Sequence, residues 1–263
     1  MSTLGKFVHS SATRSLLIKV PEVTAYFWII KVLSTTVGET FADYLNSTLG
    51  LGLNGTSIIL TIGLLVALAI QLKMKRYIPL TYWLCVVLTS ITGTLLTDNL
   101  TDNLGVSLIT SSVIFAILLA ISFFAWYKSE STLSIHSIDT TKREIFYWLT
   151  ILLTFALGTA TGDLVAERFA LGYGWSFWLF VGLIAGAGIA MRAKLIGHIP
   201  AFWITYILTR PLGASIGDFL SQNKQAGGLA WGTTKTSYVF LSVILLVVGY
   251  LTITKKDQIK VAY

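Results

Sequence analysis

Long apolar segments alternate with short polar segments along the chain from about residue 20 onward. Eight of them are long enough to cross a bilayer as helices, which takes about 20 residues at ~1.5 Å each. The predicted helices are 22–46, 55–72, 79–101, 106–127, 144–168, 174–192, 199–221 and 232–253. The pattern predicts an all-α integral membrane protein, a single membrane domain over 1–263 with eight transmembrane helices.

The predicted helices are of two kinds, which alternate. The second helix of each pair carries almost no charge in its central part, 58–70, 109–121, 177–190 and 239–251. Such segments suit a scaffold that faces lipid. The first helix of each pair carries tryptophan, glycine, hydroxyl and acidic residues, so function is expected there.

A pattern of Trp, then Gly ten residues later, then Asp five residues further on, occurs four times. Its members are Trp28, Gly38 and Asp43; Trp83, Gly93 and Asp98; Trp148, Gly158 and Asp163; and Trp203, Gly213 and Asp218. It predicts four tandem repeats of two helices, 20–76, 77–130, 142–194 and 197–254. An even number of helices makes the copies parallel, with a symmetry axis along the membrane normal. A fourfold ring and a pair of pairs both fit.

Composition supports a membrane protein, since 54% of residues are hydrophobic and 12% charged, with a mean hydropathy of +0.76. The net charge of +7 does not indicate nucleic-acid binding, because the basic residues gather before each repeat and after the last. They include Lys6, Arg14, Lys19, Lys73, Lys75, Arg76, Lys128, Lys142, Arg143, Arg192, Lys194, Lys255, Lys256 and Lys260. This distribution predicts that these connections and both chain ends are cytoplasmic.

Seven of the twelve acids lie in the second halves of the first helices: Glu39, Asp43, Asp98, Asp102, Asp163, Glu167 and Asp218. Three pairs are four residues apart, which is one face of a helix. Like charges there repel, so a shared proton, a cation or a basic residue is expected between the helices. Each repeated Asp lies ~22 Å along the helix from its Trp, toward the outer side of the membrane.

These acids predict a cation site with Asp43, Asp98, Asp163 and Asp218 as its centre and metal ligands. Glu39, Asp102 and Glu167 would be auxiliary ligands or proton carriers. Oxygen ligands without imidazole or thiolate suit H⁺, Na⁺, Ca²⁺, Mg²⁺ or Mn²⁺. Two alternatives stay open: the aspartates could accept structural hydrogen bonds or cap the second helices, or they could lie in solvated outer loops.

Other residues of the first helices have expected roles. Arg210 should pair with an acid, for which Glu39 is a candidate, as a counter-ion or a static partner, and Pro211 beside it favours a kink or hinge. Lys31 is expected to reach the cytoplasmic surface. The repeated Gly residues predict close helix packing. The repeated Trp residues predict interfacial anchors, or alternatively a plug at an inner gate.

Several phrases resemble a bacterial membrane-protein family: 21–24 (PEVT), 27–40 (FWIIKVLSTTVGET), 96–99 (LTDN) and 209–214 (TRPLGA), with Asp43 and Asp218 following. That family is described as four tandem two-helix repeats, each with a characteristic Trp, and its members are often labelled membrane-anchored proteins of unknown function. The resemblance covers the chain after about residue 19. It implies a multi-pass protein of the bacterial inner (cytoplasmic) membrane and lends no substrate.

The residues favour a transporter or exporter of a small cation, either a hard divalent ion such as Mn²⁺ or one exchanged for protons. A proton-coupled transporter of a small organic solute, a non-transporting scaffold or sensor, and an intramembrane aspartyl protease are alternatives in falling order. No enzyme activity is expected and no cofactor beyond a bound cation. The expected partners are the lipid bilayer and the small cation or solute, with a homo-oligomer left open and nucleic acid excluded.

Overall fold

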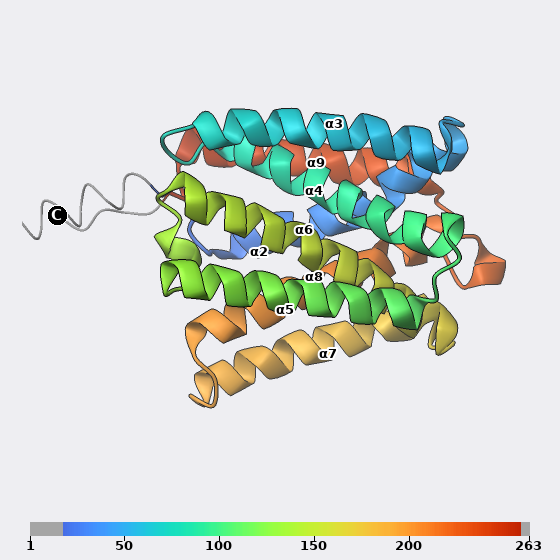
Figure 1. Cartoon of the computed structure of the whole chain (residues 1–263). Helices are drawn as coiled ribbons and strands as arrows, with labels where there is room; N and C mark the ends of the chain where they lie inside the picture. Colours follow the sequence, from blue (N-terminus) through green and yellow to red (C-terminus); the bar gives the residue numbers. More distant parts are fainter. Residues whose placement is uncertain (1–17, 259–263) are drawn as a thin grey trace, which may run out of the picture.

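The computed structural model describes residues 18–258, so Lys6, Arg14, Lys260 and the expected cytoplasmic chain ends lie outside the described residues. Eight long helices make up that part of the chain (Figure 1). They are α2 (Ala25–Asp43), α3 (Gly52–Lys73), α4 (Pro79–Asp98), α5 (Leu108–Glu130), α6 (Thr141–Asp163), α7 (Gly172–Arg192), α8 (His198–Ser221) and α9 (Thr233–Thr254). The predicted all-α fold is confirmed.

Helices α2, α4, α6 and α8, here called the ring helices, form a closed ring. Each packs against two neighbours, in the cyclic order α2, α4, α6, α8 and back to α2. Of the two arrangements that the sequence left open, the structure therefore has the ring. We call the end where the ring helices begin the basic end and the opposite end the acidic end.

The remaining long helices, α3, α5, α7 and α9, are the outer helices, and each packs mainly on the ring helix of the next repeat. Helix α3 lies on α4, α5 on α6, α7 on α8, and α9 closes the circle on α2. Side-chain hydrogen bonds tie three of these pairs: Asn99 to Ser57 at 2.7 Å, Ser122 to Thr150 at 2.9 Å and Ser237 to Thr40 at 2.9 Å. The repeat is thus not a self-contained helical hairpin, because its second helix stabilises a neighbour.

Six of these helices are long and apolar enough to cross a membrane: α3, α4, α5, α6, α7 and α9, with α4 and α6 continuing into short π-helical turns. Helices α2 and α8 do not meet that criterion. They carry the most polar interior residues, Lys31, Glu39 and Asp43 on α2 and Arg210 and Asp218 on α8. The protein is therefore a multi-pass membrane protein, and the spanning of all eight helices stays a prediction.

The repeated glycines allow the ring helices to approach closely, as predicted. A side chain at Gly38 would overlap Ser90 of α4, and one at Gly213 would overlap Thr35 of α2. Likewise, a side chain at Gly93 would overlap Phe155 of α6, and one at Gly158 would overlap Arg210 of α8. Every ring contact uses the same two positions, the repeat Gly and the residue seven after the next Trp. Small residues thus define the ring spacing.

Aromatic side chains form a belt around the basic end of the ring. The aromatic residue before each Trp contacts the Trp of the next repeat: Phe27 with Trp83, Tyr82 with Trp148, Tyr147 with Trp203 and Phe202 with Trp28, with ring centroids 5.5–6.3 Å apart. Trp83, Trp148 and Trp203 are at most 4% exposed. The prediction of interfacial anchors is wrong for these three, because ring closure turns them toward the next helix.

The segment that precedes α2 crosses the basic end of the bundle and binds its loops. Backbone hydrogen bonds join Lys19 to Ile138, Glu22 to Asp257 and Tyr77 to Ile18 at 2.8–3.2 Å. The buried Lys19 ammonium donates to Glu144 at 2.7 Å, and that carboxylate also accepts from Gln71 at 3.0 Å. These contacts join repeats one, two and three to the end of α9.

Candidate functional site

One stripe of each ring helix faces the ring interior, at steps of four residues. The residues eleven positions after each Trp are Glu39, Thr94, Thr159 and Ala214, and all four are at most 8% exposed. The repeated aspartates follow one turn later. Three of these four residues are polar or charged, so a polar layer is enclosed in the middle of the ring, with the repeated aspartates between it and the acidic end.

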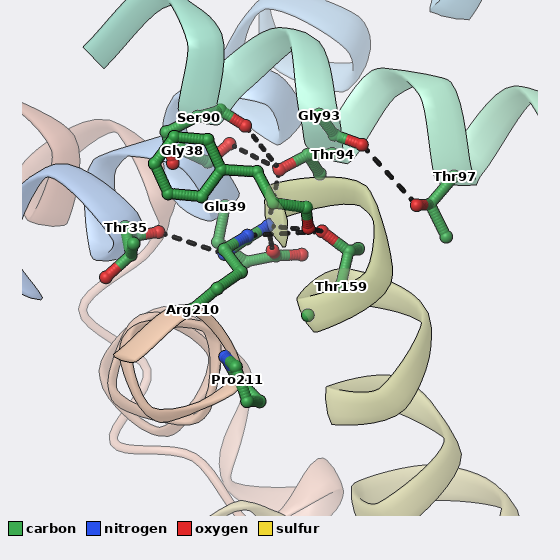
Figure 2. Close-up of polar contacts among 12 residues, drawn as sticks. Thr35, Gly38, Glu39, Ser90, Gly93, Thr94, Thr97, Thr159, Arg210 and Pro211 are labelled. Carbon is green, nitrogen blue, oxygen red and sulfur yellow. Dashed lines mark hydrogen bonds and ion pairs between the residues drawn. The ribbon is translucent and has the colours of Figure 1, made fainter. Parts of the chain in front are cut away.

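Arg210 joins all four ring helices at this level (Figure 2). Its guanidinium, fully buried, donates from Nη2 to Glu39 Oε2 at 2.5 Å and from Nη1 to the Thr35 carbonyl at 3.0 Å, both on α2. It also donates to Thr159 Oγ1 of α6 at 2.8 and 3.1 Å and to Thr94 Oγ1 of α4. The expected ion pair of Arg210 with Glu39 is therefore present.

Three carboxylates gather above the guanidinium. Glu39, Asp163 and Asp218 each place one oxygen so that the three oxygens lie within 4.8 Å of one another. Glu39 and Asp218 are buried and Asp163 is half-buried. Oxygens at this spacing can close on a single small cation, whose ligand distances are about 2.0–2.6 Å.

The other two repeated aspartates belong to the same negative field. Asp43 lies within electrostatic range of Glu39, Asp102 and Glu167, and Asp98 within range of Glu39, Asp163 and Asp43. Both side chains are half-buried. The structure thus brings Glu39 and two repeated aspartates into direct proximity and leaves the other two beside them.

None of the four repeated aspartates accepts a side-chain hydrogen bond from another described residue. Among the outer helices, α3, α7 and α9 have no side-chain cap, and α5 is capped by Ser107. The alternative in which these aspartates cap the second helices is therefore wrong. A carboxylate at this depth without donors is costly, which leaves its oxygens free for a cation or a proton.

A π-helical turn follows Asp43, Asp98 and Asp163 directly: η1 (Tyr44–Thr48), η2 (Asn99–Asn103) and η4 (Leu164–Arg168). Such turns are rare and frequently accompany functional sites. They carry Asp102 and Glu167 to exposed positions, so these two acids line the mouth of the ring and lie outside the three-carboxylate group.

The amide side chains near the acidic residues of α4 have hydrogen-bond partners on α3. Asn99 donates to Ser57 of α3 at 2.7 Å and Asn103 donates to Asn54 at 3.0 Å. Both bonds hold the π-helical turn of α4 against α3. In the fourth repeat, α8 ends at Ser221 without a π-helical turn, and Gln222 is already extended.

Lys31 does not reach the surface, and this prediction is wrong. Its side chain is fully buried and its Nζ lies 4.1 Å from the ring centres of both Phe155 and Tyr206. The ring is closed at the basic end by the aromatic belt, which blocks the way to water. Two cation–π contacts replace part of the lost hydration.

Pro211 lies inside α8, which continues through it to Ser221. It packs against Gly158 and Gly162 of α6, where a larger residue would meet it. Pro211 is thus a packing residue between α8 and α6, and the expected kink or hinge stays a prediction. The absence of a side chain at Gly158 lets Arg210 pass α6 and reach Glu39 of α2 and Thr94 of α4.

Five residues that surround the two interior cations are not among the predicted site residues: Thr35, Thr94, Thr159, Phe155 and Tyr206. A signal for them was available in the register of the repeats. Thr94 and Thr159 stand eleven residues after their Trp, where the first repeat has Glu39. An alignment of the four repeats on their Trp residues places Thr94 and Thr159 at the position of Glu39.

Fold and site together define a multi-pass helical membrane protein with a buried acidic cluster on its ring axis. A family model described as Repeat of Unknown Function (DUF347) matches the chain four times, at residues 26–77, 81–132, 146–193 and 201–257. These matches cover most of the 263 residues, so the chain belongs to this family. Neither the curated proteins nor the solved structures gave a match.

Proposed function

We propose that the protein transports a small cation through the centre of the ring, with a hard divalent ion such as Mn²⁺ as the favoured substrate. In this proposal all eight helices cross the membrane, since α2 and α8 are held in one ring with α4 and α6. The basic end faces the cytoplasm, following the distribution of Lys and Arg, and the acidic end opens to the outside of a bacterial cytoplasmic membrane.

The observation that carries the proposal is the group of Glu39, Asp163 and Asp218, with oxygens within 4.8 Å of one another on the ring axis. Intramembrane carboxylates are rare and mark ion pathways when they face a bundle interior. Among residues 18–258, no side chain donates a hydrogen bond to Asp163 or Asp218, and Glu39 is ion-paired with Arg210. The oxygen-only ligand set favours a hard cation.

The geometry suggests how a cation would be held. Exposed Asp102 and Glu167 at the mouth attract cations toward the ring, as clustered charge does in clefts. A cation among Glu39, Asp163 and Asp218 competes with the Arg210 guanidinium for Glu39. Arg210 therefore acts as a counter-ion that keeps the empty site electrically balanced. The aromatic belt closes the opposite end, so in this proposal the cation reaches the site from the acidic end.

The test replaces Asp43, Asp98, Asp163 and Asp218 singly by Asn and measures manganese accumulation in cells that express each variant at wild-type level. Binding of Mn²⁺ to the purified proteins is measured in parallel by titration calorimetry. Asp163→Asn and Asp218→Asn should lose most binding, since each removes a ligand charge. Asp139→Asn is the matched control, because this aspartate pairs with Arg143 at the basic end, and the variant should bind Mn²⁺ nearly as the wild type does. Unchanged accumulation in all four variants would reject the proposal.

A second candidate is transport of a small organic solute, because a cavity of about 760 Å³ lies beside the ring. Its lining is mostly apolar and includes Trp28, Phe202 and Met191 from α2, α8 and α7. Drug-sized ligands occupy cavities of this size and character. Replacing Gly188 at its wall by Trp should then abolish solute uptake and leave Mn²⁺ binding unchanged, which separates the two candidates.

A further inference from the structure

The outer helices cover the ring unequally, and the difference lies at one position. Forty residues after the repeat Trp, α5 carries Phe123 and α7 carries Gly188. The Phe123 ring packs on Trp203 with ring centroids 5.1 Å apart. The tryptophan in the corresponding place beside α7 is Trp28, and a side chain at Gly188 would have no neighbouring atom within 4 Å. Trp203 is 4% exposed, whereas Trp28 is half-buried, because no side chain of α7 covers it.

The uncovered space is the cavity of about 760 Å³ beside the ring, which Gly188 and Trp28 both line. Its lining is mostly apolar, and along α8 it extends from His198 to Leu212. Leu212 follows His198 by fourteen residues, which is a helical rise of ~21 Å. The hydrocarbon part of one bilayer leaflet is ~15 Å thick, half of the whole core. The cavity is thus long enough for an acyl chain that spans one leaflet.

The cavity has polar side chains at the basic end of the molecule. His136, in the segment after α5, and His198, the first residue of α8, line it there, and both are exposed. Arg192, the last residue of α7, directly follows a residue of the cavity wall and is exposed, as is Lys194. No acidic residue between 18 and 258 lines the cavity, and Glu22 lies 3.7 Å from His136. The basic side chains outnumber this carboxylate, so the mouth suits an anionic group.

We propose that this cavity binds an anionic phospholipid from the leaflet at the basic end. One acyl chain lies along α8 and packs on Trp28. The phosphate lies among His136, His198 and Arg192, as anionic headgroups do in basic pockets between membrane helices. A small water-soluble solute would fill only part of a space ~21 Å long. The acyl chain takes the place of the side chain that Gly188 lacks, and it completes the packing where α8 of the fourth repeat meets α2 of the first.

The test uses the full chain purified in a mild detergent, to which phosphatidylglycerol or phosphatidylcholine with the same acyl chains is added. Native mass spectrometry counts the lipid that remains bound. The wild type should retain one phosphatidylglycerol in preference to phosphatidylcholine. The double variant Arg192→Gln with Lys194→Gln should lower this preference about fivefold for each charge removed. Lys128→Gln, at an exposed lysine in the last turn of α5, is the matched control and should keep the preference.

Gly188→Phe is the second variant, because it gives α7 the residue that α5 has at this position. The open space around Gly188 accommodates the ring, so the protein should fold. The ring then occupies the place of the acyl chain, and the apparent dissociation constant for phosphatidylglycerol should rise at least ~10-fold. Gly186→Phe is the matched control, because Gly186 lies exposed on the same helix with equal space but does not line the cavity. This control should bind the lipid as the wild type does.

Phosphatidylglycerol should also raise the melting temperature of the wild type and leave that of Gly188→Phe nearly unchanged. Equal binding of phosphatidylglycerol by these two proteins overturns the inference, and so does equal affinity of the wild type for the two lipids. Displacement of the lipid by glycerol phosphate would assign the mouth to a soluble anion and would also overturn it. None of the lipid-binding residues belongs to the acidic cluster, so Mn²⁺ binding should be the same in Gly188→Phe and the wild type, and the transport proposal is tested independently.

Discussion

The ring helices and the outer helices are equally helical but face different surroundings. In the apolar stretches that make α4 and α6 candidate membrane spans, 72% and 56% of the residues are buried. In the corresponding stretches of α3, α5, α7 and α9, 11–28% of the residues are buried. The outer helices present apolar side chains outward, and the ring helices enclose hydroxyls, carboxylates and two cations. The difference shows that the four ring helices together enclose an interior in which Arg210 has partners on three of them.

The largest expected effect comes from removing the central cation. Arg210→Met leaves Glu39 buried without its partner, which should lower the free energy of unfolding by about 3–5 kcal/mol. Arg168→Met, on the exposed turn η4, should change little. Unfolding in detergent measures both.

The double variant Arg210→Met with Glu39→Gln is the control for this explanation. It removes both charges, so it should regain part of the lost stability. If Arg210→Met alone is as stable as the wild type, the guanidinium does not hold the ring together.

Two tryptophans provide the next comparison. Trp148, in the aromatic belt, is 4% exposed, and Trp175, on the outer helix α7, is 72% exposed. Trp148→Ala should cost about 3–5 kcal/mol because it leaves a cavity, and Trp175→Ala less than about 0.5 kcal/mol. Thermal unfolding of the two purified variants distinguishes them, and equal losses would mean that the belt does not close the ring.

Two glycines test the packing distance. A side chain at Gly38 would overlap Ser90, whereas Gly63 of α3 has no other residue nearby. Gly38→Leu should therefore destabilise the ring by about 1–3 kcal/mol, and Gly63→Leu should be neutral or slightly stabilising, since leucine favours helix. A stable Gly38→Leu protein with unchanged Mn²⁺ binding would contradict the close approach of α2 and α4.

The last comparison, with an expected effect as large as that of Gly38→Leu, concerns the basic end. Tyr77→Phe removes the donor to Asp257, which should cost about 1–3 kcal/mol. Because burial raises the pKa of Asp257, the folded protein binds this proton more tightly than the unfolded chain does. As the pH falls from 7 toward the ordinary pKa of aspartate, the free energy of unfolding of the wild type should therefore rise relative to that of Asp257→Asn. Parallel melting curves from pH 7 to about pH 5 would show no such gain if the carboxyl were solvated.

Most of the helix pattern could be predicted from the sequence because it is local. A window of about 20 apolar residues identifies a span wherever it occurs, and the predicted segment 79–101 corresponds to α4 with its π-helical turn. The four repeats were visible as a fixed spacing of Trp, Gly and Asp. The pairing of Arg210 with Glu39 was also accessible, because a buried arginine requires an acid.

The sequence by itself thus determined the class of protein, the repeats and the residue types available to a site. Only the tertiary structure decided that the ring closes, that each outer helix packs on the next repeat, and that Trp83, Trp148, Trp203 and Lys31 point inward. These features join residues that are far apart in the sequence, from 28 positions for Ser122 and Thr150 to 197 for Ser237 and Thr40, and the direction in which a side chain is buried depends on which helix is the neighbour. The direction of a side chain on its helix is encoded locally. The residues that it contacts are not, because they depend on how the four repeats close into a ring.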